Sequence, residues 1–335
     1  MKIAIHHRAK SFSEGWIDYC KTHSIPYKIV NAYDSDIIRQ ISDCDVFMWH
    51  YYHIDYRDAL FAKQLLFSLQ MAGKKVFPDF NTNWHFDDKL GQKYMFEAIS
   101  VPFVPTYVFY NSEEALQWIK NTSFPKVFKL RGGAGASNVK LVKNSRSARN
   151  LINRSFHKGF SQFNSIGYLN ERISQFLAGK GSAIDVIKGI ARLFIKPKYA
   201  RMHAPEKGYI YFQDFIPNNN TDTRIVVVGD KIIGERRGVR KGDFRASGSH
   251  ILLPDVSAVD IRCVKMAYEV SQKLKLQIGV FDFIHDVNSE PLIVEVSYGT
   301  DPDYTECEGY WTPDLNFIKS HINLSEIIIE SFLKK

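Results

Sequence analysis

Residues 277–297, QIGVFDFIHDVNSEPLIVEVS, decide the fold because they read as a β-hairpin that carries two carboxylates inside otherwise buried strands. Both flanks are rich in β-branched and aromatic residues, and the turn-type cluster HDVNSEP separates them. If the hairpin closes about Asn288 and Ser289, Asp282 lies directly opposite Glu295 on the same face of the ladder. Like charges opposed in this way destabilise a sheet, so something must compensate them.

A divalent cation is one way to compensate the pair, because carboxylate oxygens are the ligands that Mg²⁺ prefers, usually beside nucleotide phosphates. The same register places Ser297 opposite Val280, on the face that carries the two carboxylates. The alternative is that one carboxylate is exposed at a strand end or is paired with an arginine. The hairpin alone leaves both interpretations open.

The bulk composition is that of an ordinary globular protein. At 335 residues, with 45% hydrophobic and 14% aromatic residues, the chain can form two domains or one large subdivided domain. It contains no apolar run of membrane-spanning length and no signal-peptide pattern at its start. The four cysteines show no CxxC spacing, which favours neither a zinc site nor a disulfide framework. We therefore expect a cytoplasmic protein without stable membrane insertion.

The positive charge is concentrated in one segment. Residues 145–207 hold 12 Lys and Arg against 3 Asp and Glu, a surplus of nine in a chain whose formal net charge is +8. The rest of the chain therefore carries one net negative charge. A basic balance confined to one segment does not predict a nucleic-acid-binding protein.

The first 80 residues alternate between short β-type runs and amphipathic helical patterns. The runs KIAIHH, PYKIV, VFMWH and KKVF are separated by helical segments, the last of which ends at Gly73. This alternation predicts a small parallel sheet covered by helices. No glycine fingerprint follows the first run, so a dinucleotide-binding domain is not predicted. The loop HHRAKSFSEGW, at a strand end, is a candidate for part of an acceptor site.

A glycine-rich loop follows a β-type run that ends in Lys129. In KVFKLRGGAGAS the glycines allow backbone N–H groups to approach phosphate oxygens, and the lysine adds a positive charge. The segment is not a Walker A motif, because no GK[ST] follows. A flexible hairpin turn with a lysine that reaches solvent is the alternative.

A cluster of arginines follows a predicted hairpin whose tip is Gly229-Asp230. Four guanidinium groups within ten residues repel one another unless they face anions, and phosphate or carboxylate substrates are the expected anions. A solvated basic face is the alternative. Asp222, in the preceding turn, is a candidate for orienting a ribose hydroxyl or for capping the strand. The arginines are Arg236, Arg237, Arg240 and Arg245.

The basic segment also contains an amphipathic helical pattern in SAIDVIKGIARLFIK. Its apolar residues are Ile184, Ile187, Ile190 and Leu193, and Lys188 and Arg192 lie on the other side. We expect the apolar face to pack on the rest of its domain. The alternative is contact with an anionic polymer or a membrane-bound substrate.

Taken in order, several segments resemble the ATP-grasp superfamily over roughly residues 85–300, closest in pattern to the ribosomal-protein glutamate ligase and glutathione synthetase branch. The ordered set is far more specific than any one segment. The segments are DDKLGQKYMFEAISVPFVPTYVF, FPKVFKLRGGAGASNVKLV, YFQDFI, TDTRIVVVGDKIIGERRGVRKGDFRASGS and GVFDFI…LIVEVS.

The resemblance implies an α/β fold: an N-terminal parallel-sheet, pre-ATP-grasp domain over 1–84 and an ATP-grasp core over 85–335. The core would contain a mobile lid at about 120–212, which includes the basic insertion 145–207.

The resemblance also implies roles for particular residues, with ATP and Mg²⁺ as cofactors. It implies ATP-phosphate contacts by Lys89, Lys129 and the loop residues Gly132, Gly133, Gly135 and Ser137. It implies adenine binding by Gln213, Asp214, Phe215 and Ile216, with Asp222 near the ribose. It implies handling of the γ-phosphate or acyl phosphate by Arg237 and Arg245, and metal binding by Asp282, Glu295 and Ser297. Ser297 departs from the family pattern, which has Asn there, and a hydroxyl is a poorer Mg²⁺ ligand.

The activity implied is that of an ATP-dependent carboxylate–amine ligase that forms an amide through an acyl phosphate. Expected partners are small-molecule carboxylate and amine substrates, with a cell-surface sugar in polysaccharide biosynthesis or an anionic polymer as candidate acceptors; no nucleic acid is expected, and a homodimer is left open. One alternative is a nucleotide-binding protein whose degenerate metal site supports no ligation. Another is an ATP-grasp kinase.

Overall fold

The computed structural model describes residues 1–132, 138–177, 179, 181–239, 251–253 and 255–334. By its internal contacts the chain divides into two compact units. The first unit combines Met1–Phe86, Tyr94–Phe103 and Ile216–Lys335, and the second combines Asp87–Lys93 with Val104–Phe215. The domain boundary at residue 84 and the lid bounds 120–212 stay predictions.

The N-terminal part of the first unit is the parallel sheet that the alternating pattern predicts. Its strand order is β2-β1-β3-β4, and every neighbouring pair is parallel. Gly73, with φ +85°, follows α3 and supports the predicted helix end, because a side chain there would be strained. The elements are β1 (Ile3–His6), α1 (Phe12–Thr22), β2 (Tyr27–Val30), α2 (Ile37–Gln40), β3 (Val46–Trp49), α3 (Tyr56–Met71), β4 (Lys75–Phe77) and α4 (Phe80–Asn83).

The C-terminal part of the first unit contains a seven-stranded antiparallel sheet. Its order is β13-β12-β9-β10-β14-β15, with β11 paired to β10. The β9–β10 hairpin turns at Gly229, whose φ is +56°, as the Gly-Asp tip predicts. The elements are β9 (Thr221–Val228), β10 (Lys231–Gly238), β11 (Leu252–Leu253), η1 (Val256–Ala258), α11 (Ile261–Leu274), β12 (Gly279–His285), β13 (Pro291–Ser297), β14 (Gly309–Trp311), β15 (Phe317–Lys319) and α12 (Leu324–Lys334).

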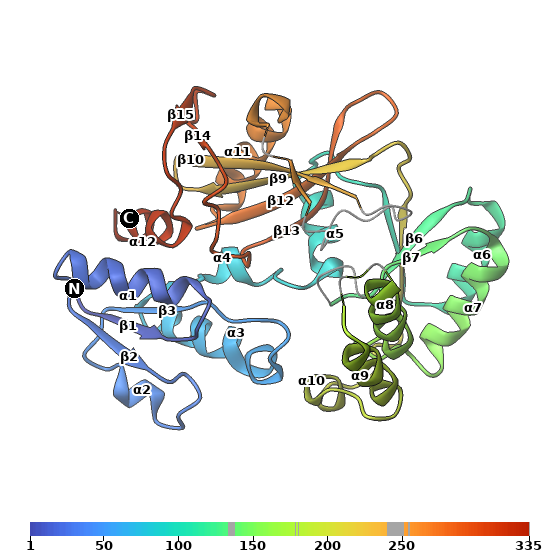
Figure 1. Ribbon diagram of the computed structural model, residues 1–335, viewed down its shortest axis with the longest axis horizontal. Coiled ribbons are helices and arrows are strands. Elements are labelled where there is room, and N and C mark those ends of the chain that lie inside the picture. The colour runs from blue at the N-terminus through green and yellow to red at the C-terminus, as the bar shows by residue number, and fades with distance from the viewer. Residues whose placement is uncertain (133–137, 178, 180, 240–250, 254, 335) are drawn as a thin grey trace. The chain divides into compact units, whose positions relative to one another are not determined.

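The two faces of this antiparallel sheet belong to two different cores. Val226 and Val280 lie on one face and join the core of the N-terminal parallel sheet. Ile225 and Phe281 lie on the other face and pack with α11. Figure 1 shows α12 beside α1, which closes the first core. Farther along the same strands, beyond the end of the first core, the face that carries Val226 and Val280 carries polar side chains instead.

The second unit is built on a four-stranded antiparallel sheet of order β5-β8-β6-β7. Helices α6 and α7 cover it around Phe128 and Phe212, and a helical hairpin of α8 and α9 follows. Helix α5 (Lys89–Ala98) begins in this unit, where Asp88 accepts a hydrogen bond from the Gly91 N–H as expected of an N-cap. The elements are β5 (Thr106–Phe109), α6 (Ser112–Asn121), β6 (Lys126–Lys129), β7 (Lys140–Val142), α7 (Ser145–Phe156), α8 (Ser165–Leu177), α9 (Ala183–Phe194), α10 (Lys198–Met202) and β8 (Ile210–Asp214).

The prediction that the apolar face of α9 packs on its own domain is wrong. The side chains of Ile184, Ile187 and Phe194 are exposed by 63%, 64% and 83%. Helix α9 instead contacts α8 through its small residue Gly189, where a Cβ would lie 2.9 Å from Leu169 Cδ1. Because α9 contacts α8 only along one edge of its apolar face, the centre of that face is exposed to solvent. None of the described helices has the length and apolar character needed to cross a bilayer.

Candidate functional site

A row of charged side chains crosses the antiparallel sheet of the first unit. Glu295 on β13 pairs with Asp282 on β12, Asp282 pairs with Arg224 on β9, and Arg224 pairs with Glu235 on β10. Because cross-strand partners share a face, the four side chains project from the same side of the sheet. Asp222 and Arg237 form the next pair along the same face.

Two arginines hold Asp282. Arg224 donates from Nε to Oδ1 at 2.8 Å and from Nη2 to Oδ2 at 2.9 Å, a bidentate pair. Arg237 Nη2 lies 3.0 Å from Asp282 Oδ2 and donates to Asp222 Oδ2 at 2.5 Å, while its Nε donates to Asp222 Oδ1 at 2.8 Å. Asp282, Arg237 and Asp222 are all buried. The carboxylates of Asp282 and Asp222 and the guanidinium groups of the two arginines thus form one network.

Burial and neighbouring charges set the protonation of this network. Burial disfavours the charge of Asp282, but Arg224 and Arg237 outweigh it and hold the pKa of Asp282 well below its usual range. Burial and the charge of Asp282 raise the pKa of Asp222 to about 6, although Arg237 opposes that shift. Burial likewise raises the pKa of Glu235. Asp282 therefore keeps its negative charge to a lower pH than Asp222 or Glu235 does.

The predicted opposition of Asp282 and Glu295 is confirmed by the strand register, as is that of Val280 and Ser297. The turn is not symmetric about Asn288 and Ser289, because the register shifts by one residue between Asp282 and Phe283. This β-bulge lies between the carboxylate pair and the turn, so it leaves the pair itself aligned.

Asp282 and Glu295 supply carboxylate oxygens, the ligands that Mg²⁺ prefers, whereas the Ser297 hydroxyl is engaged in a local turn. A carboxylate has about four acceptor sites, and the two arginines use three of those on Asp282, which leaves Oδ1 able to accept further. Glu295 is half-buried on the neighbouring strand. The Ser297 hydroxyl already donates to Gly299 O and accepts from Gly299 N, both at 3.0 Å. Metal binding by the three residues stays a prediction.

The arginines of the predicted anion site differ in their surroundings. Arg237 faces Asp222 and Asp282, so its partners here are the protein's own carboxylates instead of a substrate. Arg236 donates to Thr221 Oγ1 at 3.2 Å. Arg240 and Arg245 lie outside the described residues. Arg224 is the network member that sequence reasoning missed.

A set of polar side chains lies on β5, β6 and β8 of the second unit's sheet. Lys129 Nζ donates to Gln213 Oε1 at 2.6 Å, and Gln213 Nε2 donates to Thr106 Oγ1 at 3.2 Å. Lys126 Nζ forms an ion pair with Asp214 Oδ1 at 2.5 Å. The structure thus brings predicted phosphate and adenine residues, Lys129 and Gln213, into direct contact.

The remaining predicted nucleotide residues flank this set. Lys89 is buried at the start of α5, and its backbone N–H donates to Arg131 O at 3.0 Å. Phe215 and Ile216 follow β8, and the boundary between the two units falls between them. Adenine binding at this point stays a prediction.

The start of the glycine-rich loop is held by a carboxylate that sequence reasoning missed. Glu206 accepts backbone hydrogen bonds from Arg131 N at 3.1 Å and from Gly132 N at 3.4 Å. A Cβ on Gly132 would lie 3.1 Å from Asp87 Oδ2, so glycine permits a close approach here. The two N–H groups donate to the two different oxygens of this carboxylate, and backbone N–H groups can bind phosphate oxygens in the same way. Gly133, Gly135 and Ser137 lie outside the described residues.

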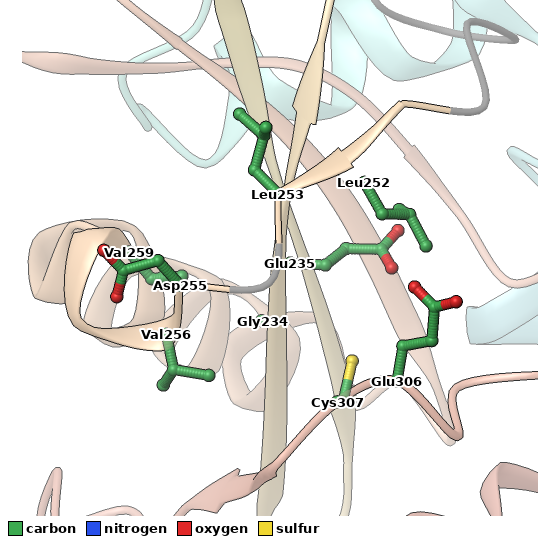
Figure 2. Close-up of a pocket in the computed structure, with 9 residues that line it drawn as sticks. All are labelled: Gly234, Glu235, Leu252, Leu253, Asp255, Val256, Val259, Glu306 and Cys307. Atoms are coloured by element: carbon green, nitrogen blue, oxygen red, sulfur yellow. The ribbon is translucent and has the colours of Figure 1, made fainter.

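A small pocket opens beside the charged row of the first unit. Figure 2 shows the carboxylates of Glu235 and Glu306 approaching each other across it, with Cys307 alongside. It has room for one small group and far too little for a nucleotide. Burial, with the charges of Glu235 and Glu306, raises the pKa of the Cys307 thiol to about 12, so this thiol is not a ready nucleophile.

These features define a class of protein. A parallel N-terminal sheet, an antiparallel sheet with paired carboxylates, and a smaller antiparallel sheet with lysines make up an α/β fold of the ATP-grasp type. Residues 197–315 match the family described as RimK-like ATP-grasp domain. The resemblance that the ordered segments predict is therefore confirmed, and with it the fold class.

Solved structures show the same fold at low sequence identity. A RimK domain ATP-grasp protein from Sphaerobacter thermophilus matches with a TM-score of 0.53 and 14% identity, over 88% of this chain and 90% of that one. Biotin carboxylase from Campylobacter jejuni, in a β-γ-ATP complex, matches with 0.61 and 14%, over 99% and 70%. D-alanine–D-alanine ligase from Bacillus anthracis matches with 0.56 and 13%, over 100% and 98%. No curated protein sequence matches significantly.

Proposed function

We propose that the chain is an ATP-dependent carboxylate–amine ligase that forms an amide through an acyl phosphate. The observation that carries the proposal is the opposed pair Asp282 and Glu295, of which Asp282 is bound by the half-buried Arg224 and the buried Arg237, inside the segment that matches the RimK-like family. Such a network presents both cation-binding carboxylates and fixed positive charge to phosphate oxygens.

The proposed reaction has two steps. An oxygen of the substrate carboxylate attacks the γ-phosphorus of ATP, and ADP leaves with the bridging electron pair. The amine nitrogen then attacks the acyl carbon, phosphate leaves with the former carboxylate oxygen, and the amine proton passes to phosphate or water. Asp282 and Glu295 would hold a Mg²⁺, which supplies charge neutralisation of the phosphates when bound. Exclusion of water protects the acyl phosphate from hydrolysis.

The remaining residues are assigned to ATP by the same proposal. The assignment gives the phosphates to the lysines and the glycine-rich loop, adenine to the end of β8, and the ribose to Asp222, whose pairing with Arg237 must then adjust. Arg237 and Arg245 are assigned to the transferred phosphoryl group. The residues proposed for ATP are Lys89, Lys129, Gly132, Gly133, Gly135, Ser137, Gln213, Asp214, Phe215, Ile216 and Asp222.

For the acceptor, we propose a small molecule or sugar used in the assembly of a cell-surface polysaccharide, in the cytoplasm. The basic excess of residues 145–207 supports an acidic or polymeric acceptor, because a positively charged segment attracts anionic molecules. A homodimer is compatible with this proposal and is not needed for it.

Two observations favour a second candidate, a nucleotide-binding protein without ligase activity. Asp282 is already bound by two guanidinium groups, and Ser297 is committed to a local turn with Gly299. Ser297→Asn separates the candidates: a gain of turnover of about tenfold or more would indicate a decayed metal site, since an amide oxygen is the better Mg²⁺ ligand. Unchanged turnover that is already substantial supports the ligase.

The test of the ligase is phosphate release in the presence of Mg-ATP and pooled amino acids, uronic acids and amino sugars. ADP and inorganic phosphate that form only with the pool support the proposal, and a new phosphate ester would instead identify a kinase. Glu295→Ala should abolish the signal. Glu290→Ala, which removes an exposed carboxylate from the turn of the same hairpin, is the matched control and should leave it unchanged.

A further inference from the structure

The helical hairpin of α8 and α9 has an apolar surface that its own unit does not cover. A capping box, in which the Ser182 side chain accepts from Asp185 N and the Asp185 side chain accepts from Ser182 N, begins α9. Gly189 then provides the close contact with Leu169 on α8. The helix therefore packs on α8 along one edge, and its exposed apolar side chains belong to a regular, capped helix.

The exposed stripe runs along the length of α9 and past its end. Ile184, Ile187 and Ile190 occupy successive turns, and Phe194 and Ile195 continue the stripe at the C-terminal end of the helix. On the preceding helix Leu177 is exposed by 79%. The row of large exposed side chains on α9 marks an interaction surface, because soluble proteins rarely expose large apolar side chains side by side.

Basic side chains accompany the stripe. From residue 183 to residue 205 the only acidic residue is Asp185, which lies 3.5 Å from Lys188 in an ion pair. The exposed Met202 continues the apolar character among these bases. The matching partner must therefore be apolar in its interior and negative at its surface. The basic residues are Lys188, Arg192, Lys196, Lys198 and Arg201.

We propose that α9 is an interfacial helix that docks the protein on an anionic lipid bilayer. A bilayer offers an apolar layer for Ile187 and Phe194 and a negative headgroup layer for the flanking lysines and arginines, which is the combination an amphipathic, basic helix recognises. The chain lies on the membrane surface instead of crossing it. The proposal is independent of ligase activity, and it would place the enzyme where lipid-linked or surface-bound acceptors are found.

The test is sedimentation of the full chain with lipid vesicles. The protein should sediment with vesicles of equal parts phosphatidylglycerol and phosphatidylcholine and stay in solution with pure phosphatidylcholine. Binding should weaken as salt is raised, because exposed charges are screened. Absence of binding to anionic vesicles, or equal binding to both compositions, overturns the proposal.

Variants assign the binding to α9. The double variant Ile187→Glu/Phe194→Glu should have a lower vesicle affinity, by about tenfold or more for each residue changed. The single variants Lys188→Glu and Arg192→Glu should each lower the vesicle affinity by about fivefold or more. Met71→Glu, at an exposed apolar position at the end of α3 in the other unit, is the control and should bind as wild type does. Circular dichroism checks that the variants remain folded.

Two further outcomes would contradict the proposal. Vesicle binding that survives Ile187→Glu with Phe194→Glu would assign it to another surface. A dimer in light scattering that Ile187→Glu dissociates, without vesicle binding by wild type, would show that a second copy of the chain covers the stripe.

Discussion

At the scale of single residues, the site is governed by how buried charges are balanced. Asp282 has both oxygens bonded to guanidinium groups, and neither Arg224 nor Arg237 is fully exposed to water. The desolvation cost of such charges is offset only while every partner is present. Removing one partner therefore leaves an uncompensated buried charge.

Asp282→Asn should lower the free energy of unfolding by about 3–5 kcal/mol. Combining it with Arg224→Gln should cost less than the sum of the two single changes, because the second change removes the charge that the first left unpaired. Urea denaturation of the four proteins measures this coupling. Single effects that add to within about 0.5 kcal/mol would contradict the network.

Burial makes His50 a source of pH dependence. The imidazole is buried, its Nδ1 accepts a hydrogen bond from Phe12 N at 3.2 Å, and its ring stacks on Phe12 at a centroid distance of 3.9 Å. Burial, with the nearby charge of Arg8, lowers the pKa of His50 to about 3. The unfolded chain therefore binds a proton below about pH 6.5 that the folded chain does not bind.

The stability that neutral His50 contributes is present above about pH 6.5 and is lost as the pH falls toward 3. The free energy of unfolding of wild type should thus fall by about 1–2 kcal/mol more than that of His50→Asn between about pH 6.5 and 5. Asn keeps an acceptor near the Nδ1 position and does not titrate. Parallel pH profiles for the two proteins would rule out His50 as the source.

Some contacts of single residues can be predicted from the sequence, and others cannot. Alternation within a hairpin was enough to place Asp282 opposite Glu295, because both lie in one local element. Arg224 lies two residues after Asp222 and so on the same face, a signal that was present in the sequence. Its bond to Asp282 depends on the pairing of β9 with β12, which are distant in the chain.

At the scale of elements, close contacts between helices depend on small residues. Helices α1 and α12 pack together, and a Cβ on Gly15 would lie 2.4 Å from Ser325 Cβ. Gly15→Ala should destabilise the protein by about 1–3 kcal/mol through overpacking, although alanine favours a helix by about 1 kcal/mol over glycine. Thermal unfolding measures the change.

Ser325→Gly provides the control, because it removes the Cβ that the new alanine methyl group would meet. The double variant should be more stable than Gly15→Ala alone, even though a second glycine disfavours α12. If Gly15→Ala alone were as stable as wild type, the helices would not be packed as closely as this contact requires.

Helix α9 shows the limit of prediction at this scale. Its pattern predicts an amphipathic helix, and the helix is present from Ala183 to Phe194. Periodicity identifies an apolar face and does not identify what covers it, so the expectation of internal packing was wrong. Gly189 determines which edge of α9 packs on α8, and a glycine does not contribute to a hydrophobic pattern in the sequence.

At the scale of the whole molecule, the order of elements was predictable and the site only in part. The alternation of the first 80 residues predicted the parallel sheet, and the ordered segments predicted the ATP-grasp fold. Among the described residues, the predicted nucleotide groups lie in the second unit except for Ile216 and Asp222, and the predicted metal residues lie in the first. Partners such as Glu206 emerge only from tertiary contacts.

The most direct test of the account follows an oxygen atom through the reaction. Mg-ATP is incubated with the pooled acids, their carboxylates labelled with ¹⁸O, and the phosphate is examined by ³¹P NMR. An acyl phosphate requires that the released inorganic phosphate carry one ¹⁸O, seen as an isotope-shifted signal that Glu295→Ala abolishes. Phosphate that forms with the pool but carries no ¹⁸O, or label retained in a phosphate ester, would contradict a ligase that works through an acyl phosphate.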